Sequence, residues 1–165
     1  MASPVKSKPK RPYTVAVEGN IGSGKTTFLN YFNKHENVSI FTEPVELWRN
    51  CNGYNLLGLM YENPHEWSFT FQSYVQLTML QQHCQRTHHP IKLMERSVYS
   101  ASVIDEHFNW LTSYSDTSID VIIYLRTMPE LAYERIKQRN RSEEKCVPFE
   151  YLKEIHDFPR RLAIL

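Results

Sequence analysis

The 165-residue sequence has few of the features that mark secreted, membrane-spanning or nucleic-acid-binding proteins. Its three cysteines, Cys51, Cys84 and Cys146, lie far apart and form no CxxC pair. This spacing argues against a disulfide framework or a zinc site and favours a reducing compartment. No apolar run approaches the roughly 20 residues of a membrane-spanning helix. A formal net charge of +1 gives no bulk attraction to polyanions, so we expect neither a nucleic-acid nor a membrane partner.

The first twelve residues form a basic segment interrupted by three prolines, Pro4, Pro9 and Pro12. Proline prevents the amphipathic helix of a mitochondrial presequence, and the segment has no apolar core for secretion. We expect residues 1–12 to be a disordered tail and the protein to be cytoplasmic. One domain is expected over residues 13–165.

Short β-rich runs alternate with helical patterns along the rest of the chain. The predicted strands are 13–18, 38–42, 91–94 and 121–125. The predicted helices are 25–34, 66–86, 103–113 and 129–139. Such alternation predicts an α/β fold, with a mainly parallel sheet covered by helices on both faces.

The segment from Gly19 to Thr26, Gly-Asn-Ile-Gly-Ser-Gly-Lys-Thr, matches the phosphate-loop pattern GxxxxGK[ST] in full. It follows a predicted strand and opens a predicted helix, which is the context that the pattern requires. Glycine allows the loop backbone to surround an anion, Lys25 reaches the β and γ phosphates, and the Thr26 hydroxyl can bind Mg²⁺. The alternative is a glycine-rich turn with a surface lysine. The predicted ATP-binding residues here are Gly19, Asn20, Ile21, Gly22, Ser23, Gly24, Lys25, Thr26 and Thr27.

Charged side chains follow the second and third predicted strands. In an open α/β sheet, ligands bind at the carboxyl ends of the strands. Glu43 there could accept a hydroxyl proton, Glu95 could offer a carboxylate to Mg²⁺, and Arg96 could stabilise developing charge. Glu43 could instead cap a helix. The sequence has no Asp-x-x-Gly element, which excludes a GTPase and favours a small-molecule kinase.

Arg135, Arg139 and Arg141 cluster at the end of the last strong helix. Cations are favourable at a helix C-terminus in any protein. Beside a phosphate loop, however, they are also typical of a lid, and we expect such a lid at about residues 139–147.

Taken together, these motifs resemble the deoxyribonucleoside kinase family, in the branch of the insect multisubstrate and mitochondrial thymidine kinases. The resemblance covers about residues 13–156. It is carried by residues 17–27, 42–45, 48–50, 58–61, 71–80, 93–97, 124–127, 133–135 and 141–144.

The resemblance implies a P-loop NTPase-type kinase that uses ATP and Mg²⁺ to phosphorylate a mainly pyrimidine deoxyribonucleoside, and that forms a homodimer. Mitochondrial localisation becomes the alternative to cytoplasmic. The implied catalytic residues are Glu43 as base, Arg96 and Lys25, with Thr26 and Glu95 on the metal. The implied nucleoside-binding residues are Trp48, Phe71, Gln72, Val75, Met79 and Ala101 around the base, and Tyr61 and Glu144 at the 3′-hydroxyl. Arg139 and Arg141 would be lid arginines over the phosphates.

The sequence departs from the family pattern at two places. After Ala101 it continues with residues that resemble a later helix, so that a whole segment is expected to be missing. After His156 it no longer resembles the family, and the last strand and helix of the family are expected to be absent. Exposed apolar area at the sheet edge should result. Two alternatives remain: a catalytically impaired, ATP-binding or dimerising remnant, and a thymidylate-type nucleoside monophosphate kinase.

Overall fold

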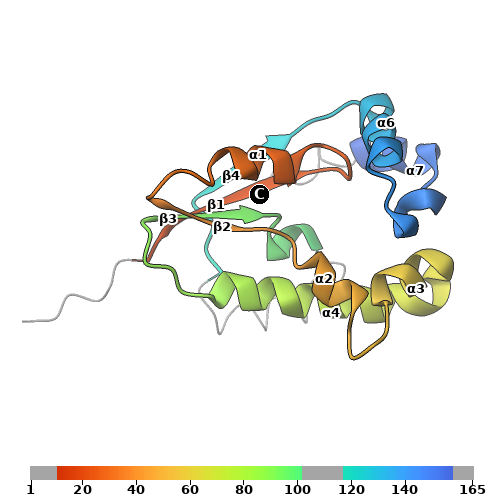
Figure 1. The fold of residues 1–165 in the computed structure, drawn as a ribbon, viewed down its shortest axis with the longest axis horizontal. Helices are drawn as coiled ribbons and strands as arrows, with labels where there is room; N and C mark the ends of the chain where they lie inside the picture. The colour runs from red at the N-terminus through yellow and green to blue at the C-terminus, as the bar shows by residue number, and fades with distance from the viewer. Residues whose placement is uncertain (1–10, 102–116, 158–165) are drawn as a thin grey trace, which may run out of the picture.

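The computed structural model describes residues 11–101 and 117–157, except for the side chains of Ser100, Ala101, Cys146 and Asp157. Figure 1 shows the arrangement of the elements in these ranges. The strands are β1 (Tyr13–Gly19), β2 (Val38–Phe41), β3 (Ile91–Glu95) and β4 (Val121–Leu125). The α-helices are α1 (Lys25–Tyr31), α2 (Val45–Arg49), α3 (Leu56–Glu62), α4 (Pro64–Cys84), α6 (Pro129–Arg139) and α7 (Phe149–Asp157). The 3₁₀ helices are η1 (Val98–Ala101) and η2 (Ser142–Cys146).

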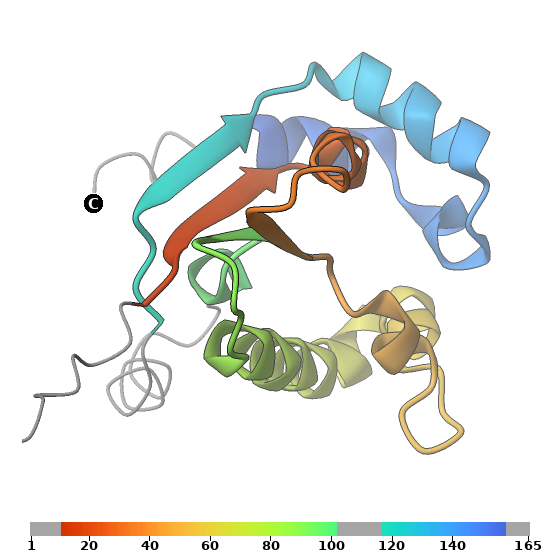
Figure 2. The ribbon, with the colours of Figure 1, turned by 60° about the vertical axis from the view of Figure 1, so that its left-hand side comes forward.

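The four strands form one parallel sheet in the order β2-β3-β1-β4 (Figure 2). Val15 of β1 pairs with Leu93 on one side and with Val121 on the other. All the strands therefore end at the same edge, where the loops after β1, β2 and β3 converge. This arrangement confirms the predicted α/β fold with a parallel sheet.

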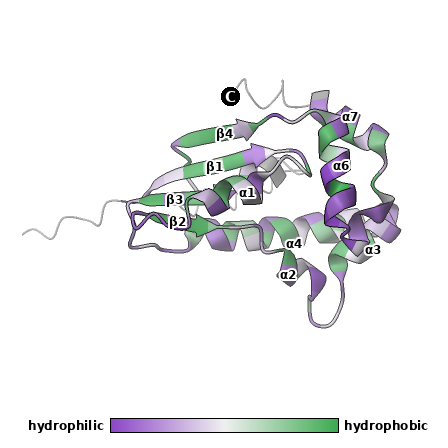
Figure 3. Ribbon diagram, turned by 45° about the horizontal axis from the view of Figure 1, so that its top comes forward, coloured by the Kyte–Doolittle hydropathy of each residue, from purple (hydrophilic) through white to green (hydrophobic). Residues whose placement is uncertain are grey.

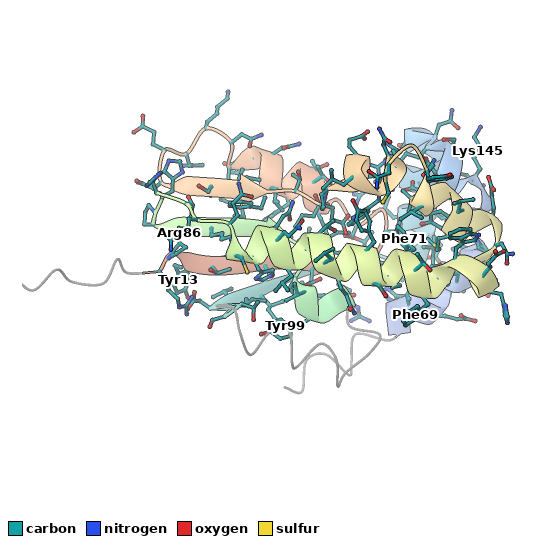
Figure 4. The ribbon with its side chains drawn as sticks, turned by 90° about the horizontal axis from the view of Figure 1, so that it is seen from below. Tyr13, Phe69, Phe71, Arg86, Tyr99 and Lys145 are labelled. Atoms are coloured by element: carbon teal, nitrogen blue, oxygen red, sulfur yellow. The ribbon has the colours of Figure 1, made fainter. Side chains whose placement is uncertain are left out.

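Helices α1 and α4 cover opposite faces of the sheet (Figures 1 and 4). Val17 and Leu93 pack with Leu29 of α1 in one apolar cluster. Because successive side chains of a strand point to opposite faces, the fully buried Ala16 and Met94 face the side of α4. In Figure 3, β4 and much of β1 are coloured hydrophobic, whereas much of α6 is coloured hydrophilic.

Lys92 fixes the C-terminal end of α4 against β3. Its buried Nζ donates hydrogen bonds to the carbonyls of Gln82 (2.6 Å), His83 (2.7 Å) and Gln85 (3.0 Å). These are the carbonyls that the end of a helix leaves without partners in the helix itself. Burial, and then the charge of Lys92, lower the pKa of His83 to about 4. The hydrogen bonds of Lys92 thus hold the C-terminal end of α4 near the start of β3.

The predicted elements agree with the structure except at some helix ends. All four strands are confirmed, and α6 has the predicted bounds. Helix α1 ends at Tyr31 rather than residue 34, because tight turns follow in which Asn33 N donates to Asn30 O and His35 N to Phe32 O. Helices α2, α3 and α7 were not predicted. The predicted helix 103–113, the tail up to residue 10 and the end after 157 lie outside the described residues.

Strand β4 forms one edge of the sheet, since within residues 11–101 and 117–157 it pairs with β1 alone. Its Ile122 is 57% exposed, and Tyr124 is also exposed. In the described residues, this edge of the sheet therefore exposes apolar side chains.

Candidate active site

The phosphate loop connects β1 to α1 and requires glycine for both conformation and space. Gly22 has a φ of 74° and Gly24 a φ of 92°, which is the left-handed region that disfavours residues with a Cβ. A Cβ on Gly22 would lie 2.5 Å from the carbonyl oxygen of Ala132 in α6. Glycine therefore lets the loop pack directly against the backbone of α6.

Lys25 begins α1 and points back into the loop. Its Nζ donates hydrogen bonds to the carbonyls of Gly19 and Asn20, both at 3.1 Å. Burial of the amine, and then the positive charge of Arg96, lower its pKa to about 8. A cation held among loop carbonyls at the end of β1 is poised to meet an anionic ligand.

Thr26 and Glu95 form the part of the site that fits a metal. The Thr26 hydroxyl donates a 2.8 Å hydrogen bond to the Glu95 carboxylate at the end of β3. Hydroxyl and carboxylate oxygens are ligands that Mg²⁺ accepts, and Mg²⁺ commonly takes its other ligands from phosphates and water. In the part of the chain that is described, no three His, Cys, Asp or Glu side chains group as a metal site. The hydroxyl of Thr26 and the carboxylate of Glu95 therefore fit a metal that takes its other ligands from phosphates and water.

Glu43 and Arg96 form an ion pair beside the loop. The Arg96 Nε lies 2.6 Å from a Glu43 carboxylate oxygen, and both side chains are largely buried. Arg96 has a φ of 63°, which is uncommon for a residue other than glycine, asparagine or aspartate. The carboxylate and the guanidinium are thus held together at the ends of two neighbouring strands.

One cleft of about 1780 Å³ joins the phosphate loop, the strand ends and the cleft-facing side of α4. Of the predicted residues it is lined by all of the loop from Gly19 to Thr27, and by Glu43, Trp48, Tyr61, Phe71, Gln72, Val75, Glu95, Arg96, Arg139, Arg141 and Glu144.

Two aromatic side chains form the buried wall of the cleft. Trp48 and Phe71 meet edge to face with 5.9 Å between ring centroids, and the Trp48 Nε1 donates to the Thr78 hydroxyl at 3.0 Å. Phe71 lies on the inner side of α4, whereas Phe69 lies on the outer side and is 70% exposed (Figure 4).

Two predicted pocket residues stand apart from this set. Met79 is 1% exposed, belongs to the apolar cluster around α4 and is not among the residues that line the cleft. Its contact with a ligand stays a prediction. The side chain of Ala101 lies outside the described part of the structure.

Two adjacent carboxylates of η2 bind arginines from different elements. Glu144 accepts hydrogen bonds from Arg139 (2.7 Å) and Arg141 (3.3 Å). From the sequence, the two arginines were expected at the phosphates and Glu144 at the 3′-hydroxyl of the sugar. Glu143 accepts from Arg49 of α2 through both carboxylate oxygens, at 2.9 and 3.2 Å. The hydrogen bonds from Arg49 lower the pKa of Glu143 to about 2. The segment η2 therefore connects α6 to α2 along the cleft.

Three further residues contact this machinery: Glu18 and Glu143, to which the sequence analysis gave no role, and Arg135, which it placed only in the basic cluster of the expected lid. Glu18 accepts hydrogen bonds from the amide and hydroxyl of Ser97. Arg135 donates to the loop carbonyls of Gly22 and Ser23, both at 3.4 Å, and Glu143 anchors η2. For Glu18 a signal was present, since it directly precedes the phosphate loop.

Comparison with known proteins identifies the family. The deoxynucleoside kinase family model matches residues 15–106 and 102–159. The chain is 45% identical over 161 residues to mitochondrial thymidine kinase 2 of Homo sapiens, with 86% of this chain and 61% of the relative covered. It is 34% identical over 195 residues to deoxycytidine kinase 1 of Xenopus laevis (92% and 72% covered) and 33% identical over 186 residues to deoxycytidine kinase of Mus musculus (86% and 72%).

The chain therefore belongs to the deoxynucleoside kinase family. The family match divides at residues 102–106, the region in which the sequence departs from the family pattern. The chain spans about 61% of the length of the thymidine kinase 2 relative. Among residues 11–101 and 117–157, no helix has the length and apolar character needed to span a membrane.

Proposed function

We propose that this chain transfers the γ-phosphoryl group of ATP to the 5′-hydroxyl of a deoxyribonucleoside, mainly a pyrimidine one. The observation that carries the proposal is that the phosphate loop with Lys25 and the Glu43–Arg96 ion pair line the same cleft. In this proposal, the phosphate donor and the group that activates the hydroxyl share one space.

The loop side of the cleft is the donor site of this proposal. Lys25 neutralises charge on the β and γ phosphates, and the loop glycines allow the backbone to approach them. Thr26 and Glu95 would hold Mg²⁺, which neutralises charge on the phosphate oxygens when it is bound. Arg139 and Arg141 form the lid of this proposal, since both line the cleft from the end of α6.

The α4 side of the cleft is the acceptor site. Glu43 takes the proton of the 5′-hydroxyl as the new bond forms, and Arg96 orients Glu43 and stabilises the developing charge. Tyr61 and Glu144 hydrogen-bond the 3′-hydroxyl, which fixes the reach of the 5′-oxygen. Glu144 then needs to share its carboxylate between the sugar and the arginines that it already binds.

The base site consists of Gln72 with Trp48, Phe71 and Val75. A glutamine amide has both a donor and an acceptor, so it can pair two neighbouring atoms of a base edge. A mismatched base would leave that amide without a partner in a buried place, which costs about 1–3 kcal/mol. Apolar side chains around it suit a flat, small base. The names of the relatives, thymidine and deoxycytidine kinases, favour a pyrimidine.

A catalytically impaired chain is the second candidate. It is favoured by the division of the family match at residues 102–106. Such a chain would bind ATP, or form a homodimer or pair with a longer sister chain, without turnover. A thymidylate-type kinase would need further cations for the phosphate of its acceptor.

For the compartment, we propose the cytoplasm, with mitochondria as the alternative. The composition favours a reducing compartment. The alternative rests on the similarity to mitochondrial thymidine kinase 2.

The test is to purify the chain and measure ATP-dependent phosphorylation of thymidine, deoxycytidine and thymidine monophosphate in the presence of Mg²⁺. The proposal expects turnover of the nucleosides and its loss in Lys25→Ala and Glu43→Gln. ATP binding without any product would favour the impaired chain. Turnover of the monophosphate alone would favour the thymidylate-type kinase.

A further inference from the structure

The carboxylate of Glu18 lies directly under the backbone that carries Arg96. Glu18 is the penultimate residue of β1, and its side chain is buried at the base of the cleft. One oxygen of this carboxylate accepts a 2.8 Å hydrogen bond from the backbone N–H of Ser97 and a 2.7 Å hydrogen bond from the Ser97 hydroxyl. Ser97 is 1% exposed, so water cannot easily replace these bonds.

Arg96 has a backbone conformation that must be held by its neighbours. Its φ of 63° is sparsely populated for a side chain with a Cβ. On one side, the Arg96 N–H donates to the carbonyl of Val17 at 2.9 Å, which continues the pairing of β3 with β1. On the other side, the N–H of Ser97, the next residue along the chain, donates to the Glu18 carboxylate. Both peptide groups that flank Arg96 are therefore tied to β1.

The direction of the Arg96 side chain depends on this conformation. A left-handed residue at the end of a strand turns its side chain away from the direction that the strand would give it. Here the turn brings the guanidinium within 2.6 Å of the Glu43 carboxylate on the next strand. If Ser97 were released, Arg96 would be free to relax into the extended conformation, and the ion pair would be disrupted.

We infer that Glu18 is a positioning residue, which holds Arg96 against Glu43 by binding both donors of Ser97. The catalytic value of this role rests on the function proposed above, but the positioning itself does not. A carboxylate suits the task because it only accepts hydrogen bonds and can take two on one oxygen. Its negative charge also lies near the cations Arg96 and Lys25, whose charge it favours.

The first experiment follows the Arg96 side chain directly, by nitrogen-15 NMR of arginine Nε–H groups. The Arg96 signal is assigned by its loss in Arg96→Lys. In Glu18→Ala, we expect the solvent exchange rate of this proton to rise about tenfold or more, because a hydrogen bond to a charged group is lost. Glu18→Gln, which retains one acceptor, should give a smaller rise. The control Glu150→Gln, an exposed carboxylate on α7, should leave the signal unchanged.

An unchanged Arg96 signal in a folded Glu18→Ala protein would overturn the inference. If Glu18→Ala does not fold, Ser97→Ala takes its place, since it removes the hydroxyl bond alone and should raise the exchange rate less. Folding of each variant is checked by circular dichroism and thermal unfolding.

The second experiment is a double-mutant cycle in the kinase assay. Glu18→Gln should lower kcat by about tenfold in the unmodified chain and should have no further effect in an Arg96→Ala background. A purely structural role would lower kcat in both backgrounds, and that result would overturn the inference. If the unmodified chain has no turnover, the proposed function fails, and the NMR measurement still decides the positioning role.

Discussion

Arg96 and Glu43 join the ends of two neighbouring parallel strands, with 2.6 Å between the guanidinium Nε and a carboxylate oxygen. Arg96 follows β3 directly, and Glu43 follows β2 by two residues. An acid and a base that are this close stabilise each other's charged forms. The ion pair therefore places a group that could act as a proton acceptor directly beside a cation.

Replacement of Glu43 with glutamine should remove the proton acceptor and keep the shape of the side chain. We expect kcat for thymidine phosphorylation to fall by about 10²–10⁴-fold, the usual worth of a general base. ATP affinity should change little, because Lys25 and the loop are intact. The matched control is Glu36→Gln in the exposed loop before β2. Equal losses in both variants would contradict the role of Glu43.

Removal of the Lys25 amine should weaken nucleotide binding. In Lys25→Ala we expect the Kd for an ATP analogue to rise by about 10–100-fold, because a charge-assisted contact to phosphate is lost. Lys34→Ala, which removes an exposed lysine just after α1, serves as the control. The measurement is titration with a fluorescent nucleotide. A Kd unchanged in Lys25→Ala would rule out the loop as the phosphate site.

The pKa of Lys25, lowered by burial to about 8, should make nucleotide affinity depend on pH. As pH rises through about 8, Lys25 loses its proton in the free protein, so affinity for a triphosphate should fall. In Lys25→Arg the guanidinium stays charged, and this fall should disappear. Titration of nucleotide binding from pH 6.5 to 9.5, at constant ionic strength, measures both proteins.

Lys25 should also make the stability of the protein depend on pH, but in the opposite direction: stability should rise where nucleotide affinity falls. The folded pKa of about 8 lies below the ordinary value of 10.5, so the unfolded chain binds more protons between these two pH values. The free energy of unfolding should therefore rise with pH over this window, relative to Lys25→Met, by on the order of 2 kcal/mol. Urea unfolding of the two proteins at pH 7.5 and pH 10 tests the sign. A falling difference would contradict the buried charge.

Gly22 and Gly53 offer a test of the close approach between the phosphate loop and α6. Both have positive φ, but a Cβ on Gly22 would meet the Ala132 carbonyl at 2.5 Å, whereas a Cβ on Gly53 would meet nothing within 4 Å. Gly53→Ala should cost about 1 kcal/mol from backbone strain alone. Gly22→Ala should cost more, by about 1–3 kcal/mol, and should also weaken nucleotide binding. Equal costs in urea unfolding would argue against the contact.

The Arg49–Glu143 pair should give stability that is lost in acid. Hydrogen bonds from Arg49 hold the Glu143 pKa at about 2, below the ordinary 4.5. The pair therefore contributes fully above pH 4.5, and its contribution is lost as pH falls toward 2. At pH 7, Glu143→Gln should cost about 1–3 kcal/mol, and the difference should shrink in this acid window. Glu150→Gln, in an exposed pair with Lys153, should cost much less.

The sheet and the phosphate loop could be predicted because their signals are local. The strands are short apolar runs, and the loop has a fixed pattern of glycines with Lys25. Pro129 marks the start of α6, and Asn140, in the left-handed conformation, follows its end. These are the places where a proline and an asparagine suit a helix boundary whatever lies around them.

Helices α2 and α3 escaped prediction because each is one or two turns long and is stabilised by the fold around it. Trp48 of α2 packs into the apolar cluster that contains Phe71 and Val75 of α4. A contact between residues this far apart in the chain cannot be predicted from the local sequence. Helix α3 did have a local signal, since the Asn55 side chain accepts a hydrogen bond from Gly58 N at its start. The ion pair between Arg139 and Glu144 was not predicted, for another reason. The sequence analysis assigned Arg139 to the phosphates and Glu144 to the sugar, so it did not pair these two residues with each other.

The adjacent carboxylates of η2 link α6 to the α2 side of the cleft through two ion pairs. Arg49 beside Trp48 binds one of them, and Arg139 at the end of α6 binds the other. Helix α6 cannot separate from α2 unless one of these ion pairs breaks. If a ligand on the loop side of the cleft shifted η2, it would change the affinity for a ligand beside Trp48. By thermodynamic linkage, the ligand beside Trp48 would change the affinity on the loop side by the same factor.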